Sequence, residues 1–173
     1  MDGDRDRTFS RVYDEHVWTI YGFVGYRVRD RQEAEDLTQQ TFERALRAWP
    51  RYDPARASES TWLIAIARNL VIDHFRRRRD VPVEDPGGAS RDPADPSGDP
   101  AANLGVSPEL EAALGRLSAR DREIIALRFG GDLKGQEIAD LLDLSLANVQ
   151  QILSRALRQL RKELEEAAAG EGP

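Results

Sequence analysis

The chain has no cysteine, one methionine and two histidines among its 173 residues. The lack of cysteine excludes a disulfide framework and a thiolate metal site. No apolar run approaches the roughly 20 residues of a membrane span, so we expect no membrane insertion. Residues 1–7 are charged and no apolar core follows them, so no secretory signal is predicted. We therefore expect a cytoplasmic protein that holds no metal and no cofactor.

The net charge of −6 argues against nucleic-acid binding only if it is spread evenly, and it is not. Residues 1–79 contain 15 basic and 13 acidic side chains, whereas residues 80–108 contain 1 and 6. Residues 109–173 contain 9 and 12. Four consecutive arginines stand at Arg76–Arg79. Because local patches determine contacts with phosphates, whole-chain acidity does not exclude a nucleic-acid ligand.

Three segments of the N-terminal part have helical periodicity, at residues 8–28, 32–49 and 62–79. Pro50 ends the second segment, and the polar stretch 51–60 is predicted to be a loop. Three helices with short connections indicate a small bundle. The expected inward residues are Phe9, Val12, Tyr13, Val17, Ile20, Val24, Val28, Ala34, Leu37, Thr38, Thr41, Phe42, Ala45, Trp49, Leu63, Ile66 and Leu70.

Residues 80–108 have a different composition, with six prolines, four glycines, three serines and six acidic residues. Such a segment buries too little apolar surface to fold, which is typical of a flexible linker. The predicted fold is all-α: two small helical domains, at residues 1–79 and 109–166, joined by this linker. Residues 167–173 are expected to form a disordered tail.

The stretch 135–164 has the pattern of a helix-turn-helix. Its first helix carries Ile138 and the small Ala139, and Ser145 is a suitable N-cap for the second. Leu146, Val149, Ile152 and Leu153 are expected to be buried. The polar residues between them can contact base edges or phosphates: Asn148, Gln150, Gln151, Ser154 and Arg155. The alternative is an ordinary pair of amphipathic helices.

Catalytic chemistry has little support in the sequence. His16 and His74 lie far apart along the chain, and there is no cysteine and no glycine-rich phosphate loop. Glu35 and Asp36 point in directions about 100° apart on a helix, so they indicate a solvated acidic face or a protein-docking surface. We therefore predict that the chain is not an enzyme.

The arginine run ends a helix that also carries Trp62, Asn69 and Asp73. It could be a solvated helix end, where cations interact favourably with the helix dipole. Aromatic and amide side chains beside arginines are, however, what unstacked bases and a phosphate backbone require. This helix is therefore predicted to bind nucleic acid.

Four motifs follow one another along the chain: Ala34–Phe42 (AEDLTQQTF), Trp62–Asn69 (WLIAIARN), Leu117–Glu123 (LSARDRE) and Glu137–Ala139 (EIA). Together they resemble bacterial sigma factors of the extracytoplasmic-function group. The N-terminal half resembles their promoter-opening domain and the C-terminal half their promoter-recognising helix-turn-helix domain. In order and spacing they cover most of residues 9–165.

The resemblance implies a transcription initiation factor that binds core RNA polymerase and promoter DNA. The polymerase contacts would be the clamp helices of the largest subunit and the flap, and an anti-sigma factor would regulate the chain. The acidic linker would enter the basic channels of polymerase. Polymerase binding would use Asp36, Leu37, Gln39, Gln40 and Phe42. Binding and opening of the –10 element would use Trp62, Arg68, Asn69, Asp73, Arg76 and Arg77. Reading of the –35 element would use Gln136, Asn148, Gln150, Gln151, Ser154 and Arg155.

The sequence departs from the family pattern at three places. Gln40 stands where the family usually has an acidic residue, and Asp143 stands at a hinge that usually has glycine. The recognition helix usually begins Gly-Thr-Val followed by basic residues, whereas here it reads ANVQQ from Ala147. Each missing base contact would weaken –35 binding by about 1–3 kcal/mol.

Two other interpretations remain open at the level of sequence. A free-standing helix-turn-helix regulator would bind duplex DNA without polymerase, at a palindromic site. An adaptor without a DNA role would leave the arginine run and the amide-rich helix unexplained. Retention by purified core polymerase distinguishes the sigma-factor hypothesis from both.

Overall fold

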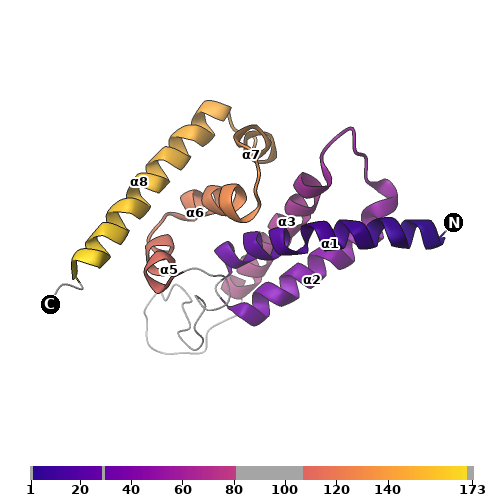
Figure 1. Cartoon of the computed structure of the whole chain (residues 1–173), viewed down its shortest axis with the longest axis horizontal. Helices are drawn as coiled ribbons and strands as arrows, with labels where there is room; N and C mark the ends of the chain where they lie inside the picture. The colour runs from indigo at the N-terminus through magenta and orange to yellow at the C-terminus, as the bar shows by residue number, and fades with distance from the viewer. Residues whose placement is uncertain (1, 29, 81–106, 171–173) are drawn as a thin grey trace.

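The computed structural model describes residues 2–28, 30–80 and 107–170, and the described residues form helices and no strands (Figure 1). The N-terminal region comprises α1 (Asp2–Arg27), α2 (Arg31–Ala48), the short η1 (Trp49–Arg51) and α3 (Glu59–Asp80). The C-terminal region comprises α5 (Pro108–Gly115), α6 (Ala119–Ile125), the π-helical turn η2 (Ala126–Gly130), α7 (Gly135–Leu142) and α8 (Leu146–Gly170). Nearly all of the predicted linker lies outside the described residues.

Short polar side chains cap the helices at the predicted breaks. The Asp30 carboxylate accepts a hydrogen bond from the Glu33 backbone N–H at the start of α2. The Ser118 hydroxyl accepts one from Asp121 at the start of α6, and Ser145 accepts one from Asn148 at the start of α8. These caps satisfy backbone donors that have no partner inside the helix. The cap predicted at Ser145 is thus confirmed.

The apolar stripe predicted for α2 is buried as expected, from Ala34 through Ala45. The stripe of α1 is largely buried as well, but Tyr13 is 44% exposed and its prediction as an inward residue was wrong. The Tyr13 ring packs edge-on against Phe42 while its other side faces solvent. An amphipathic ring at the border of a stripe keeps its apolar side on the core and its hydroxyl in water.

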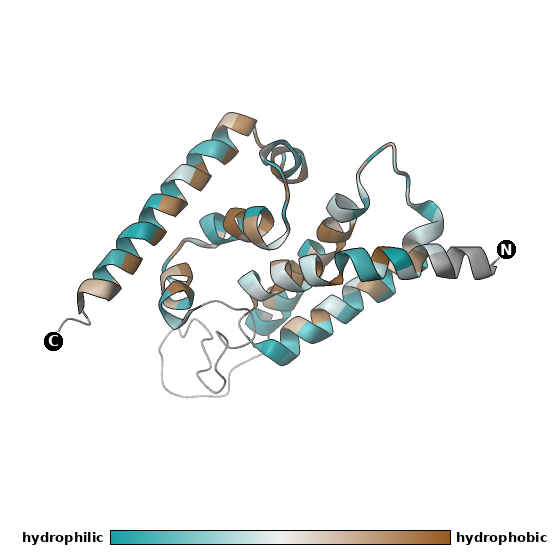
Figure 2. Cartoon of the chain, viewed as in Figure 1, coloured by the Kyte–Doolittle hydropathy of each residue, from teal (hydrophilic) through white to brown (hydrophobic). Residues whose placement is uncertain are grey.

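The helix-turn-helix prediction is confirmed in α7 and α8. Asp143 adopts the left-handed conformation between them, with φ 54° and ψ 50°, as expected at this hinge. Leu146 was predicted to be buried but is 37% exposed, because it lies at the first position of α8 over Gly135. Helix α8 also continues through Gly170, into the segment that we expected to be disordered. Figure 2 shows hydrophilic and hydrophobic residues alternating along it.

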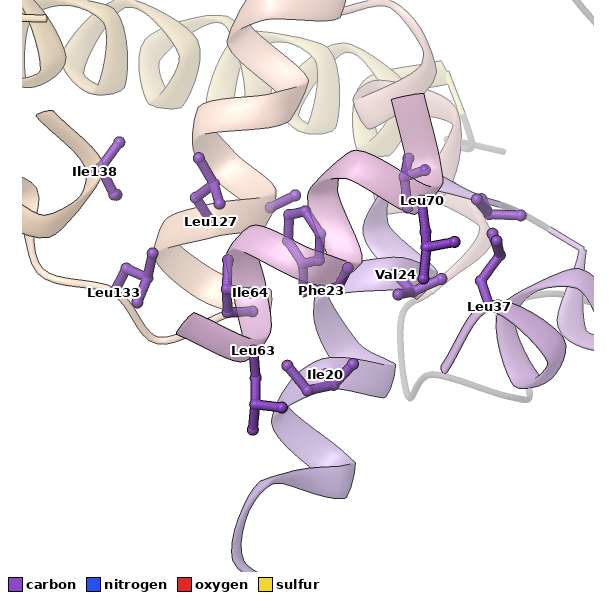
Figure 3. Close-up of a cluster of buried hydrophobic side chains, with 14 of the residues drawn as sticks. Ile20, Phe23, Val24, Leu37, Leu63, Ile64, Leu70, Leu127, Leu133 and Ile138 are labelled. Carbon is purple, nitrogen blue, oxygen red and sulfur yellow. The ribbon is translucent and has the colours of Figure 1, made fainter. Parts of the chain in front are cut away.

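The two helical regions pack against each other through one continuous apolar core. Phe23 of α1 and Ile64 of α3 meet Leu127 of η2, and Leu133 and Ile138 extend the same cluster (Figure 3). All five side chains are 0–1% exposed. The sequence predicted cores inside each region but gave no indication that the regions would share one.

Glycine permits the closest approach between the regions. A Cβ atom at Gly130 would lie 2.8 Å from the Phe23 Cα and 2.9 Å from the Gly22 carbonyl oxygen. Backbone atoms cannot move aside as a flexible side chain can. Position 130 therefore requires glycine, because any side chain there would overlap the backbone of α1.

Candidate nucleic-acid and polymerase interface

Helix α2 presents an acidic and amide face to solvent. Asp36, Gln39 and Gln40 are exposed, and Gln39 donates a hydrogen bond to Glu43 at 3.0 Å. Leu37 and Phe42, the other two predicted polymerase contacts, are each only 5% exposed. They pack α2 against the bundle, and their contact with polymerase stays a prediction.

An apolar groove runs beside this face, between α1 and α2. It has a volume of about 770 Å³, and Tyr13, Trp18 and Phe42 lie in its lining. Trp18 is among the most exposed large apolar side chains of the described residues. Polar residues of α2, among them Gln39 and Glu43, also contribute to its lining. Exposed apolar surface beside polar side chains is typical of a protein-docking site.

Trp62, at the start of α3, belongs to an aromatic cluster. Its ring centroid lies 5.9 Å from that of Trp49 and 4.9 Å from that of Tyr52. Tyr52 also donates a hydrogen bond to the Ala57 carbonyl, which ties down the loop before α3. The cluster leaves Trp62 half-buried, as a rigid platform beside the loop.

Arg68 lies in the interface between the two regions. Its Nε donates to Glu123 Oε1 at 2.8 Å, and the side chains are 24% and 9% exposed. Nearby, Arg27 donates to the Ala119 carbonyl at 3.2 Å, and burial lowers the pKa of Arg27 although Glu123 opposes the shift. Sequence reasoning missed Glu123, because a single acidic residue on a short helix gives no sign of a partner 55 positions away.

Farther along α3 the predicted contacts are accessible. Asn69, Arg76 and Arg77 are exposed, and Asp73 accepts a hydrogen bond from Arg76 at 3.0 Å. These residues follow one another along the helix toward its C-terminal end. The structure thus brings four of the six predicted –10 contacts to the accessible part of α3 and places Arg68 and Trp62 in packed surroundings.

The predicted –35 contacts of α8 form a solvent-exposed polar face. Asn148, Gln150, Gln151 and Ser154 are all exposed. Arg155 is exposed too, but its guanidinium binds the buried Asp121 carboxylate at 2.7 Å and so joins α8 to α6. Gln136 of α7 is exposed and donates to Asp140. This face lies on the second helix of the helix-turn-helix.

One group of side chains has metal-ligand chemistry among the described residues. Ligand atoms of Glu15, His16 and Glu59 lie within 4.8 Å of one another. Arg11 forms ion pairs with both glutamates, at 2.6 and 2.7 Å. The Arg11 guanidinium therefore supplies the positive charge beside both carboxylates. Its ion pair with Glu59 joins α1 to α3.

The comparisons with known proteins agree with this geometry. Residues 12–81 match the family model Sigma-70 region 2, and residues 113–162 match Sigma-70, region 4. The chain is 32% identical over 166 residues to the ECF RNA polymerase sigma factor SigX of Bacillus subtilis, covering 92% of this chain and 85% of SigX. It is 32% identical over 169 residues to BldN of Streptomyces coelicolor, covering 96% and 63% of the two chains. The chain therefore belongs to the ECF (extracytoplasmic-function) RNA polymerase sigma factors.

A solved structure shows the same fold. It is the sigma factor RpoE from Bartonella quintana in complex with the anti-sigma factor NepR, and the match has a TM-score of 0.71 at 21% identity. The alignment covers 92% of this chain and 98% of RpoE. Every helix in the described part of the chain is too short or too polar to span a bilayer.

Proposed function

We propose that the N-terminal region binds polymerase through α2 and the promoter –10 strand through α3, while α8 reads duplex DNA at the –35 element. The observation that carries this proposal is the exposure of three separate sets of polar side chains: Asp36, Gln39 and Gln40 on α2, Asn69, Arg76 and Arg77 on α3, and Asn148, Gln150, Gln151 and Ser154 on α8. In this role the chain acts in the cytoplasm and performs no chemistry itself.

The face of α2 has features that suit a protein partner. Its carboxylate and amides are exposed beside the apolar groove formed with α1. Polar specificity next to apolar area is the usual anatomy of a protein interface. An anti-sigma factor that covered this face would block polymerase binding, which gives a direct route to regulation.

The packing of the two regions limits what α3 can do. Arg68 donates its Nε to Glu123 and cannot give the same donor to DNA. Thr61 of α3 likewise donates to Glu137 of α7 at 3.1 Å. Strand binding over the first half of α3 therefore requires the C-terminal region to move away, and polymerase, by binding the two regions at separate places, would supply the free energy for this step.

Retention of the purified chain on immobilised core polymerase tests the proposal. Asp36→Ala should lower the affinity for polymerase without altering the circular dichroism spectrum, because Asp36 is exposed and accepts only a surface hydrogen bond from Gln32. Asp140→Ala on α7 is the matched control, since Asp140 makes an equivalent surface bond with Gln136. Wild-type affinity in Asp36→Ala would contradict the docking role, and failure of the unaltered chain to bind polymerase would favour a free-standing DNA-binding regulator.

A further inference from the structure

A cavity of about 190 Å³ opens between α2 and α3, beside the outward face of α2. Liquid water occupies about 30 Å³ per molecule, so the space admits a small anionic group together with a few waters. Leu37 and Leu70, both buried, contribute to its lining. The charged and titratable side chains of the lining are Arg44, Asp73, His74, Arg77 and Arg78.

The arginines around this cavity are only partly neutralised. Arg78 binds both carboxylate oxygens of Glu33 at 3.0 Å. Asp73 forms its ion pair with Arg76, which lies outside the lining. Arg44 and Arg77 are exposed and have no carboxylate partner within the described residues. Two guanidinium groups, one from each helix, thus border the cavity without an ion pair among the described residues, and the Asp73 carboxylate lies in the same lining.

His74 adds a polar atom that lacks a hydrogen bond. Its Nε2 is buried and has no hydrogen-bond partner among the described residues. The Glu33 carboxylate lies 3.3 Å from it, close enough for an ion pair but without the alignment of a hydrogen bond. Buried polar groups are nearly always hydrogen-bonded, so His74 places an unsatisfied polar atom in the wall of the cavity.

We propose that this cavity binds one backbone phosphate of the promoter strand, held by Arg44 and Arg77 together and approached by His74. A phosphodiester offers two unesterified oxygens, and guanidinium groups bind such oxygens in pairs. The exposed arginine run continues along α3 from the cavity, so a strand that follows the run passes the opening. This inference rests on the proposed function and adds Arg44, a residue of the polymerase-binding helix, to the DNA contacts.

Salt-dependent binding of a single strand tests the proposal with the full chain. The probe is a fluorescent oligo(dT) of about 20 nucleotides, and the readout is the slope of log affinity against log salt concentration, which changes by about 0.7 for each phosphate contact of a single strand. Arg44→Gln should reduce the slope by up to about 0.7, as should Arg77→Gln. Because both bind the same phosphate, the double variant should also lose about 0.7 and not about 1.4.

Two controls make the experiment specific. Arg47→Gln removes an exposed arginine from the last turn of α2, outside the cavity, and should leave the slope unchanged. An oligo(dT) with uncharged methylphosphonate linkages should bind Arg44→Gln and the unaltered chain alike. A slope in Arg44→Gln equal to that of the unaltered chain would overturn the proposal, and so would an unaltered chain that leaves the charged strand unbound at low salt.

Retention on core polymerase, measured for the same variants, separates this proposal from the proposed function. Arg44→Gln should retain wild-type affinity for polymerase. If instead it loses polymerase binding while its salt slope stays normal, the cavity receives an acidic side chain of polymerase and the phosphate assignment is wrong. If the unaltered chain fails to bind polymerase but Arg44→Gln still lowers the slope, the phosphate site stands and the sigma-factor role falls.

Discussion

The two helices that carry the predicted DNA contacts, α3 and α8, differ in how much of their polar surface is available. Helix α8 exposes Asn148, Gln150 and Gln151 to solvent, whereas α3 has Arg68, one of its predicted contacts, bound to Glu123 of the C-terminal region. Duplex DNA can therefore approach α8 in the arrangement seen here. A single strand can bind along the whole of α3 only after the two regions have separated.

The difference arises from the spacing of apolar residues. In α8 the buried positions are Val149, Ile152, Ala156 and Leu160, a single stripe at helical spacing. In α3 the neighbouring pairs Leu63–Ile64 and Leu70–Val71 are all buried, which gives the helix two apolar sides. One side faces the N-terminal bundle and the other faces the C-terminal region, where Ile64 packs beside Gly131. A helix that is apolar on two sides needs a second partner.

Of the substitutions that test this comparison, adding a methyl group at Gly130 should lower the free energy of unfolding the most. Gly130→Ala places a Cβ against the backbone of Phe23 and Gly22, so we expect the free energy of unfolding to fall by about 3 kcal/mol, the upper end for overpacking. The radius of gyration from small-angle X-ray scattering should increase as the regions separate. Gly170→Ala is the control, because nothing lies within 4 Å of its added Cβ. Equal stability of the two variants would mean that the regions do not pack as described.

Glu123→Gln should have the next largest effect. It removes the charge that Arg68 and Arg120 share, and we expect about 2 kcal/mol of destabilisation, typical of hydrogen bonds to charged groups. A double-mutant cycle with Arg68→Gln, followed by chemical denaturation, measures the coupling between the two regions directly. A coupling energy near zero would contradict the claim that this pair joins them.

Much of this fold could be predicted from the sequence, because local signals are strong where they exist. The cap at Ser145, the hinge at Asp143 and the stripe of α2 all depend on residues within a few positions of each other. Tyr13 and Leu146 were assigned to the wrong environment, since an apolar stripe does not show where its border lies. The shared core could not be predicted, because the contact of Gly130 with Gly22 joins residues far apart along the chain.

The candidate site was predicted unevenly for the same reason. Exposed polar residues such as Gln39 and Gln151 follow from helical periodicity, and their exposure agrees with the prediction. Leu37 and Phe42 lie in the same motif but are buried, because a motif match does not show which of its residues face the core. Arg44 was missed because only the approach of α3 gives it a cavity and makes it a neighbour of Arg77.

On α8, Gln151→Ala should weaken duplex binding of the assembled holoenzyme upstream of the start site by about 1–3 kcal/mol, the worth of one good base contact. Gln151 is exposed, so thermal stability should not change. Glu165→Ala, at an exposed position farther along α8, is the control and should bind like the unaltered chain. Footprints of equal strength for both variants would show that Gln151 does not contact the –35 element.

The smallest effect is expected for the ion pair between Arg78 and Glu33. Both residues belong to the N-terminal region, and their side chains are 42% and 31% exposed. Exposed pairs contribute about 1 kcal/mol or less, so Glu33→Gln should lower the free energy of unfolding much less than Glu123→Gln. If the two variants lost a similar free energy of unfolding, the location of Glu123 between the regions would not explain its effect on stability.

The separation of the two regions on polymerase tests the account most directly. Because the chain has no cysteine, spin labels can be attached to it at Ser10→Cys on α1 and Glu165→Cys on α8, both at exposed positions. Pulsed electron paramagnetic resonance then gives the distance between the labels in the free chain and in the complex with core polymerase. We predict one shorter distance in the free chain and a longer one on polymerase. The same distance distribution in both states would contradict the claim that the regions part before α3 binds DNA.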